Sequence, residues 1–335
     1  MEKTKTCRRG LKRLLALLLS ALCMLGVLPL SAFAMEPGQT ASSWLGDQYV
    51  GSDGQHYYSP APYTYLVYNS DGTMDVRTSS GGSAYRHYML TVSDGSSHQV
   101  YCVESGIPYN TSDNTYTSES GTNSQYLNLL PAEARRGITL TAIYGWKPGA
   151  SLPISGINED DYKMATQIIL WEYQQQLRSD PYTRHGNGHA SADQYYSVIA
   201  GRPAEKAYNW ILEQVASHST VPSFTSSSKD GAPELELKWD SEQRVYTLTV
   251  ADTNNLGIDL DLLSGSGVSV TRNGNQYTFT SKDMIMDPVT FEFRKDIPVA
   301  NDMLIWGRPG YQTMMTGASD PVSFFVKIKT ETYGT

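Results

Sequence analysis

Cys102 is the residue whose chemistry most needs an explanation in this sequence. The chain has three cysteines, and Cys7 and Cys23 lie in a segment that has the pattern of a cleavable export signal. The exported chain would therefore keep one thiol and form no internal disulfide. A lone thiol outside the cell must be buried and inert, paired with another chain, catalytic, or covalently committed to a group other than sulfur.

The export signal is predicted at residues 1–34. Basic residues between Lys3 and Arg13 are followed by the apolar run Leu14–Leu28, and residues 32–34 form the small-residue cleavage site Ala-Phe-Ala. The apolar run is short for a membrane span and is followed directly by Pro29. We therefore expect cleavage after this site, secretion, and no membrane insertion of the mature chain.

Composition sets the broad class of the protein. The 335 residues are 40% hydrophobic and 18% charged, which is enough to build one large or two moderate folded domains. The formal net charge of −8 argues against nucleic acid as a partner, because nucleic-acid binders normally present a basic face. The sequence predicts a globular, acidic, exported protein.

The region that holds Cys102 has strand patterns. Alternating residues from Trp44 to Glu104 are interrupted by Asp-Gly pairs at 71–72 and 94–95, which predict hairpin turns. Cys102 then lies on the strand that returns from the second turn. Residues 105–127 are rich in Ser, Thr, Asn and Gly without a clear period, and they predict a long loop.

Helices are expected after this region. The predicted ranges are Pro131–Tyr144, Asn158–Leu177, Ser191–Ile199 and Pro203–Ser217. The second range is the clearest, because it begins with Asn158 as a cap and three acidic residues in the first turn. Gln167 and Trp171 are one turn apart on the apolar side of this helix.

Short strands dominate the rest of the chain. A linker is expected at 221–231, followed by seven strands at 235–239, 245–251, 268–272, 276–280, 289–294, 303–306 and 323–329. This spacing is typical of an immunoglobulin-like β-sandwich. We therefore expect a mixed α+β domain at 35–220 and an all-β sandwich at 232–331.

Two short motifs connect Cys102 with the clearest helix. The first motif, Tyr101-Cys102-Val103, ends a strand. The second begins with Thr166-Gln167, and Leu170 and Trp171 lie three and four residues after Gln167. Together these motifs resemble the thioester (TQXA) domains of Gram-positive bacterial surface adhesins. In that family the cysteine sulfur and the glutamine side-chain carbonyl form an internal thioester.

The resemblance implies a role for each residue of the two motifs. Cys102 would supply the sulfur and Gln167 the acyl group of the thioester. The supporting motif residues would be Tyr101, Val103, Thr166, Leu170 and Trp171. Ile169 departs from the family pattern, which usually has a small residue at this position, and we expect the change to alter packing around the bond rather than the bond itself.

The implied chemistry makes demands on the fold. Forming a thioester from a thiol and a carboxamide releases ammonia and is uphill in water, so both groups must be held together in a water-poor site. The bond is then a stored electrophile, which a lysine amine can open to give an amide and a free Cys102 thiol. This reaction needs no cofactor and no metal. The sequence has no lysine between Met35 and Trp146, so the strands around Cys102 carry no competing amine.

The resemblance also implies a biological setting. It predicts a cell-surface adhesin that reacts once rather than an enzyme that turns over, with a lysine amine on a host or neighbouring-cell protein as its partner. Residues 326–335 contain no cell-wall sorting signal. We therefore expect this chain to be the monomeric N-terminal tip of a longer surface protein.

Two other interpretations remain open from the residues alone, and a metal site is disfavoured. Cys102 could be an inert core residue of a secreted module that binds its ligand without a covalent bond. It could also be the nucleophile of a secreted cysteine peptidase or acyltransferase, with His185 or His189 as base and Asn187 as the orienting residue. The His185/His189 spacing mimics a metal pair, but two intervening glycines disfavour a helix and no third ligand is evident.

Overall fold

The computed structural model describes residues 35–109, 111, 115–295 and 302–332. The export signal predicted at 1–34 lies outside these residues and stays a prediction. Six strands form a closed barrel in the order β1-β4-β5-β14-β13-β6. Their bounds are β1 Thr40–Gln48, β4 Arg86–Val92, β5 Ser97–Cys102, β6 Thr115–Ser120, β13 Leu304–Gly307 and β14 Met314–Thr316. A separate two-stranded sheet pairs β2 (Tyr63–Tyr68) with β3 (Met74–Ser79).

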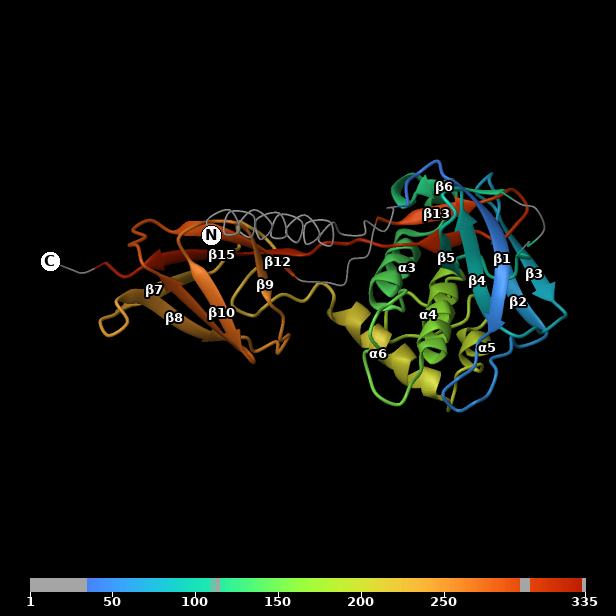
Figure 1. Cartoon of the computed structure of the whole chain (residues 1–335), viewed down its shortest axis with the longest axis horizontal. Coiled ribbons are helices and arrows are strands. Elements are labelled where there is room, and N and C mark those ends of the chain that lie inside the picture. The colour runs from blue at the N-terminus through green and yellow to red at the C-terminus, as the bar shows by residue number, and fades with distance from the viewer. Residues whose placement is uncertain (1–34, 110, 112–114, 296–301, 333–335) are drawn as a thin grey trace, which may run out of the picture. The chain divides into compact units, whose positions relative to one another are not determined.

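Helices accompany the barrel. Their bounds are η1 Gly121–Asn123, α2 Gln125–Leu129, α3 Ala132–Tyr144, α4 Glu159–Gln174, α5 Ala192–Tyr196 and α6 Pro203–Ser217. Helices α3, α4 and α6 pack against one another, and Figure 1 shows α4 next to both α3 and α6. The approach of α3 to α4 is close, because a Cβ atom at Gly137 would lie 2.2 Å from the Tyr173 ring.

Helix α4 is the central helix of this part of the fold. It begins at a capping box in which Asn158 and Asp161 bond each other's backbone N–H. Asp161 also accepts the Ser52 N–H over 3.0 Å and the hydroxyl proton of Tyr57. Every residue from Asp161 to Gln174 is buried, which is the pattern of a helix covered on all sides.

The strands of the second part form a continuous seven-stranded sheet in the order β10-β11-β8-β7-β15-β12-β9. Their bounds are β7 Glu234–Asp240, β8 Val245–Ala251, β9 Leu260–Ser264, β10 Ser269–Asn273, β11 Gln276–Ser281, β12 Val289–Lys295 and β15 Ser323–Thr330. β7 pairs with β15 through residues 234–237 and with β8 through residues 238–240, so it passes from one half of the sheet to the other.

An aromatic core lies between the two halves of this sheet. Phe279 of β11 meets Phe293 of β12 with ring centroids 6.5 Å apart, and Phe293 stacks on Phe324 of β15 at 6.0 Å. A strand that changes sheets and a shared core between the sheets define a sandwich. The predicted fold class, a mixed α+β part followed by an all-β sandwich, is confirmed.

The strand expected at 303–306 was assigned to the wrong sheet. It forms β13, which pairs with β6 and β14 in the barrel, and β14 pairs with β5. Figure 1 shows β13, in the orange-red of the chain's last part, beside the green β6. The seventh sandwich strand is instead β9, whose residues Leu260–Ser264 pair with β12.

Two expected irregular segments are more ordered than predicted. The loop expected at 105–127 contains β6, in which Tyr116 and Ser118 point inward while the residues between and beside them are polar. The linker expected at 221–231 is attached to the sandwich, because Phe224 packs on Tyr277 with a centroid distance of 5.1 Å and Ser226 forms a bridge with β15. Both segments are polar in composition, so their sequences did not predict this order.

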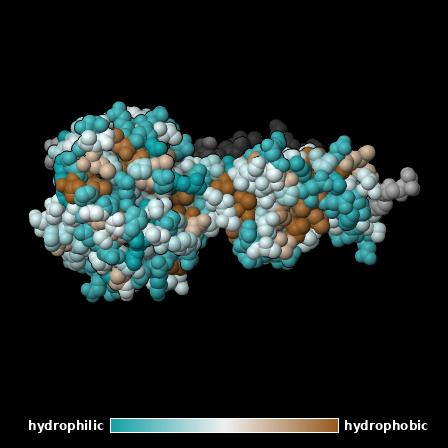
Figure 2. Space-filling view, turned by 180° about the vertical axis from the view of Figure 1, so that it is seen from behind, coloured by the Kyte–Doolittle hydropathy of each residue, from teal (hydrophilic) through white to brown (hydrophobic). Residues whose placement is uncertain are grey.

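The surface of the described chain is mostly hydrophilic, with small separate apolar patches on the face shown in Figure 2. No helix among the described residues is both long enough and apolar enough to cross a membrane.

Candidate functional site

Cys102 is the last residue of β5 and is completely buried. The register pairs it with Met314 of β14. The next residue, Val103, donates its backbone N–H to the Thr313 carbonyl over 3.0 Å. The return of the chain at β14 thus fixes the backbone on one side of the cysteine.

Gln167 fixes the backbone of Cys102 on the other side. The Cys102 N–H donates to Gln167 Oε1 over 3.0 Å, and Gln167 Nε2 donates to the Cys102 carbonyl over 2.7 Å. Because a backbone N–H only donates and a carbonyl only accepts, these two bonds define which end of the carboxamide is oxygen. Gln167 is 1% exposed, so both of its polar atoms need these partners.

The Cys102 sulfur lies in a site closed to water. Trp171 Nε1 donates to Sγ over 3.3 Å, and the Glu104 backbone N–H donates over 3.4 Å. Burial raises the pKa of the Cys102 thiol to about 12. The thiol is therefore protonated at neutral pH, and it must lose its proton for the sulfur to attack a carbonyl.

Tyr101 and Thr166, which precede Cys102 and Gln167, both bind Trp146. The Tyr101 hydroxyl donates to the Trp146 carbonyl over 3.1 Å, and Thr166 Oγ1 accepts the Trp146 N–H over 3.0 Å. Gly145 makes room for this contact, since a Cβ there would lie 2.3 Å from Thr166 Cγ2. Trp146 thereby holds strand β5 and helix α4 in one relative register.

The other motif residues are buried in the core. Val103, Ile169 and Leu170 are each 0% exposed. The structure therefore buries every site residue predicted from the two motifs, and it gives hydrogen bonds to Tyr101, Thr166 and Trp171 beside the pair. Ile169 is accommodated within this core at the position where the family pattern has a small residue.

Glu104, Gln312 and Thr313 are site residues that the sequence reasoning missed. Glu104 Oε2 accepts the Thr313 N–H over 3.0 Å and the Thr313 hydroxyl proton over 2.8 Å. Burial raises the pKa of the Glu104 carboxyl above its usual range. Gln312 Nε2 points to the Glu104 carbonyl at 3.5 Å. Residues 312 and 313 precede β14, so only the unexpected barrel strand could have revealed them.

Two lysines lie near helix α4. Lys163, four residues before Gln167, has its ammonium 4.4 Å from the Trp146 ring centroid and 3.5 Å from carboxylate oxygens of Glu159 and Asp160. Lys147 donates to the Ile143 carbonyl, and burial lowers its pKa to about 8. Both amines thus have partners of their own.

The residues proposed for a peptidase site are not assembled with Cys102. His185 and His189 are exposed, whereas Cys102 is completely buried. Asn187 instead shapes its own loop, donating to the Gln175 carbonyl over 2.8 Å and accepting the backbone N–H groups of His189 and Ala190. No group of three or more His, Cys, Asp or Glu side chains suited to a metal gathers within the part of the chain that the structure describes.

The arrangement can support acyl transfer. The Cys102 N–H is aimed at Gln167 Oε1, the oxygen on which negative charge develops when a nucleophile adds to the carboxamide carbon. The opposite end, Nε2, is the ammonia that would leave. Sulfur, carbonyl and a fixed N–H donor are thus assembled without bulk water.

Comparison with known proteins agrees with this geometry. Residues 99–217, which include both motifs, match the model of the thioester domain family. This match confirms the resemblance predicted from the motifs: the chain carries a thioester domain. No curated protein matches the sequence significantly.

Solved structures with similarity to this chain include the following three. The thioester domain of the Staphylococcus aureus TIE protein is 15% identical, with a TM-score of 0.48, and the match covers 87% of this chain and 99% of that one. The Bacillus anthracis TIE protein is 8% identical, with a TM-score of 0.35 and coverages of 88% and 49%. A pilus-presented adhesin is 8% identical, with a TM-score of 0.26 and coverages of 87% and 100%.

Proposed function

We propose that this chain is the adhesive region of a bacterial surface protein and that Cys102 and Gln167 form an internal thioester which captures an amine covalently. The reciprocal pairing of the Gln167 carboxamide with the Cys102 backbone, beside a fully buried sulfur, carries this proposal. The proposed supporting residues are Tyr101, Val103, Thr166, Leu170 and Trp171.

The proposed reaction has two steps. In the first, the Cys102 sulfur adds to the Gln167 carbonyl carbon, its proton passes to the amide nitrogen, and ammonia leaves. In the second, a lysine amine of a host or neighbouring-cell protein adds to the same carbon, and Cys102 leaves as a thiol after taking a proton from the amine. Each chain reacts once, so the protein is a covalent binder rather than a turnover enzyme.

The predicted export signal supports a location outside the cell. A thioester in a buried pocket also suits a secreted protein that must keep its electrophile from water until a partner arrives. We propose a cell-surface location, as part of a longer protein attached to the cell wall of a Gram-positive bacterium.

Intact mass spectrometry of the purified mature chain tests the proposal. The parent should be lighter than its sequence by one ammonia. Treatment with methylamine should then add the mass of one methylamine to this lighter form. Cys102→Ala should have its full mass and should not react with methylamine. A parent of full mass with a freely titrating thiol would refute the proposal.

The same variant separates this function from non-covalent binding. A binding module with an inert cysteine would retain its ligand after Cys102→Ala and would release it in denaturant. A thioester adhesin would lose the denaturant-resistant complex in that variant.

A further inference from the structure

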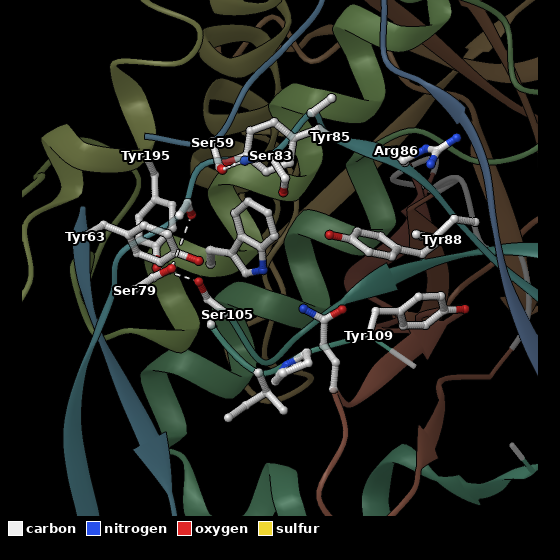
Figure 3. Close-up of a pocket in the computed structure, with 18 residues that line it drawn as sticks. Ser59, Tyr63, Ser79, Ser83, Tyr85, Arg86, Tyr88, Ser105, Tyr109 and Tyr195 are labelled. Carbon is white, nitrogen blue, oxygen red and sulfur yellow. Dashed lines mark hydrogen bonds between the residues drawn. The ribbon is translucent and has the colours of Figure 1, made fainter. Parts of the chain in front are cut away.

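An aromatic cavity of about 450 Å³ lies beside the buried cysteine. Its walls include the rings of Tyr63, Tyr85, Tyr88, Tyr109, Tyr195 and Trp171. Figure 3 shows Tyr63 and Tyr195 on one side and Tyr88 and Tyr109 on the other. The volume is within the range of pockets that hold small molecules or single side chains.

Trp171 and Gln312 connect this cavity with the candidate reaction site. Both residues line the cavity. Trp171 also donates to Cys102 Sγ over 3.3 Å. A hydrogen bond from Gln312 to the Cys102 thiol lowers the thiol pKa, although burial has the larger effect and raises it. A molecule in the cavity would therefore lie against two side chains that themselves contact the sulfur.

Gln312 has an unused acceptor at this point. The residue is 5% exposed, and its Oε1 is buried without a hydrogen-bond partner in the described structure. The orientation of its carboxamide is set by Nε2, which points to the Glu104 carbonyl. A buried carbonyl oxygen without a donor is costly, and a ligand that brings an N–H group would remove this cost.

The charge of the cavity selects the form of such a ligand. Among the described residues that line it, none carries a carboxylate and Arg86 is the one with a charged side chain. An ammonium ion entering this space would lose water and meet a positive charge, both of which favour loss of its proton. The neutral amine that results is the form that attacks a thioester, and its alkyl chain fits apolar aromatic walls.

We propose that this cavity is the binding site for the alkyl chain and amino group of an unbranched primary amine such as a lysine side chain, with Gln312 Oε1 accepting an N–H from the attacking nitrogen. The inference rests on the proposed function and assigns its nucleophile-binding site. Gln312 is then a residue that positions the amine. The amine nitrogen bonds to the Gln167 acyl carbon, the carbon–sulfur bond breaks, and the amine's proton ends on Cys102.

Reaction of the intact thioester protein with two amines of similar basicity tests the site. Methylamine and n-butylamine are added at equal concentration and pH, and the gain of one amine is followed by intact mass. The parent is compared with Gln312→Met and with Gln243→Met, a control in which an exposed glutamine of the turn after β7 is changed. The mass before treatment reports thioester formation in each variant.

We expect butylamine to react at least about tenfold faster than methylamine with the parent, because full burial of its three additional methylene groups would give about fiftyfold. Gln312→Met should slow both amines by about tenfold through loss of the acceptor, whereas Gln243→Met should behave as the parent. Equal rates for the two amines would overturn the cavity as the binding site, and an unchanged rate in Gln312→Met would overturn the role of Gln312.

The outcomes also separate this inference from the function beneath it. A parent without the ammonia deficit refutes the thioester itself and the inference with it. A parent that forms the thioester but does not distinguish the amines refutes the inference alone. If Gln312→Met fails to form the thioester, the ratio of the two rates in the parent decides.

Discussion

Replacing Thr166 by Val tests whether Trp146 holds the two motifs in register. Val has nearly the same shape as Thr but lacks the hydroxyl that accepts the Trp146 N–H over 3.0 Å. Thr166 is 0% and Trp146 4% exposed, so water cannot replace the lost acceptor. An unsatisfied buried N–H costs about 1–3 kcal/mol, and we expect the free energy of unfolding to fall by this amount.

Urea denaturation in a Cys102→Ala background measures this loss without a contribution from a cross-link. Thr139→Val is the matched control, because Thr139 Oγ1 only donates to the Arg135 carbonyl of its own helix. Its effect should stay below about 0.5 kcal/mol. A Thr166→Val variant as stable as the control would refute the reasoning, since the Trp146 N–H would then have found another acceptor.

A double-mutant cycle extends the test to the strand. Tyr101→Phe removes the donor to the Trp146 carbonyl, which lies 3.1 Å away. Because Tyr101 and Thr166 bind the same residue, we expect their effects to be coupled by about 0.5–3 kcal/mol. Additive effects would mean that strand and helix are anchored independently.

Three further outcomes follow from the structure. Arg178→Met should lower the free energy of unfolding by about 3–5 kcal/mol, because it leaves the Glu172 carboxylate buried without its cation, whereas Arg294→Met at an exposed ion pair should cost less than about 1 kcal/mol; similar losses in urea denaturation would contradict this. After methylamine has opened the thioester, iodoacetamide should alkylate Cys102 slowly at pH 8 and faster with each rise in pH, because burial raises the thiol pKa to about 12; a plateau near pH 9 would show an ordinary thiol. A chain that ends at residue 220 lacks β13 and β14, and we expect it to fold poorly and to show no ammonia deficit by intact mass; a folded, ammonia-deficient product would show that the barrel closes without them.

Local signals predicted the elements that carry Cys102 and Gln167. The Asp-Gly turn at 94–95 defined the strand that ends at Cys102, and the Asn158 cap defined the start of the helix that carries Gln167. Both signals act within a few residues, so they can be read without knowledge of the rest of the fold. The two motifs then indicated which strand and which helix face each other.

Local sequence signals could not predict the pairing of strands that lie far apart in the chain. β14 pairs with the strand of Cys102 although more than two hundred residues separate them in the chain. Residues 304–316 have the composition of any short strand pair, and nothing in their local pattern distinguishes a barrel from a sandwich. Gln312 and Thr313 were missed for the same reason, because their importance follows from the partner strand rather than from their own sequence.

The order of strands has a consequence for the candidate site. The chain builds most of the barrel, then β7 to β12 of the sandwich, then returns to the barrel with β13 and β14 before it completes the sandwich with β15. The backbone of Val103, next to the cysteine, therefore receives its partner only after most of the sandwich has been synthesised. Since Glu104 and the sulfur depend on the same returning segment, a closed, water-poor site requires the chain through β14. The site thus depends on a barrel segment that follows most of the sandwich in the chain, and formation of the proposed thioester should report on completion of the barrel.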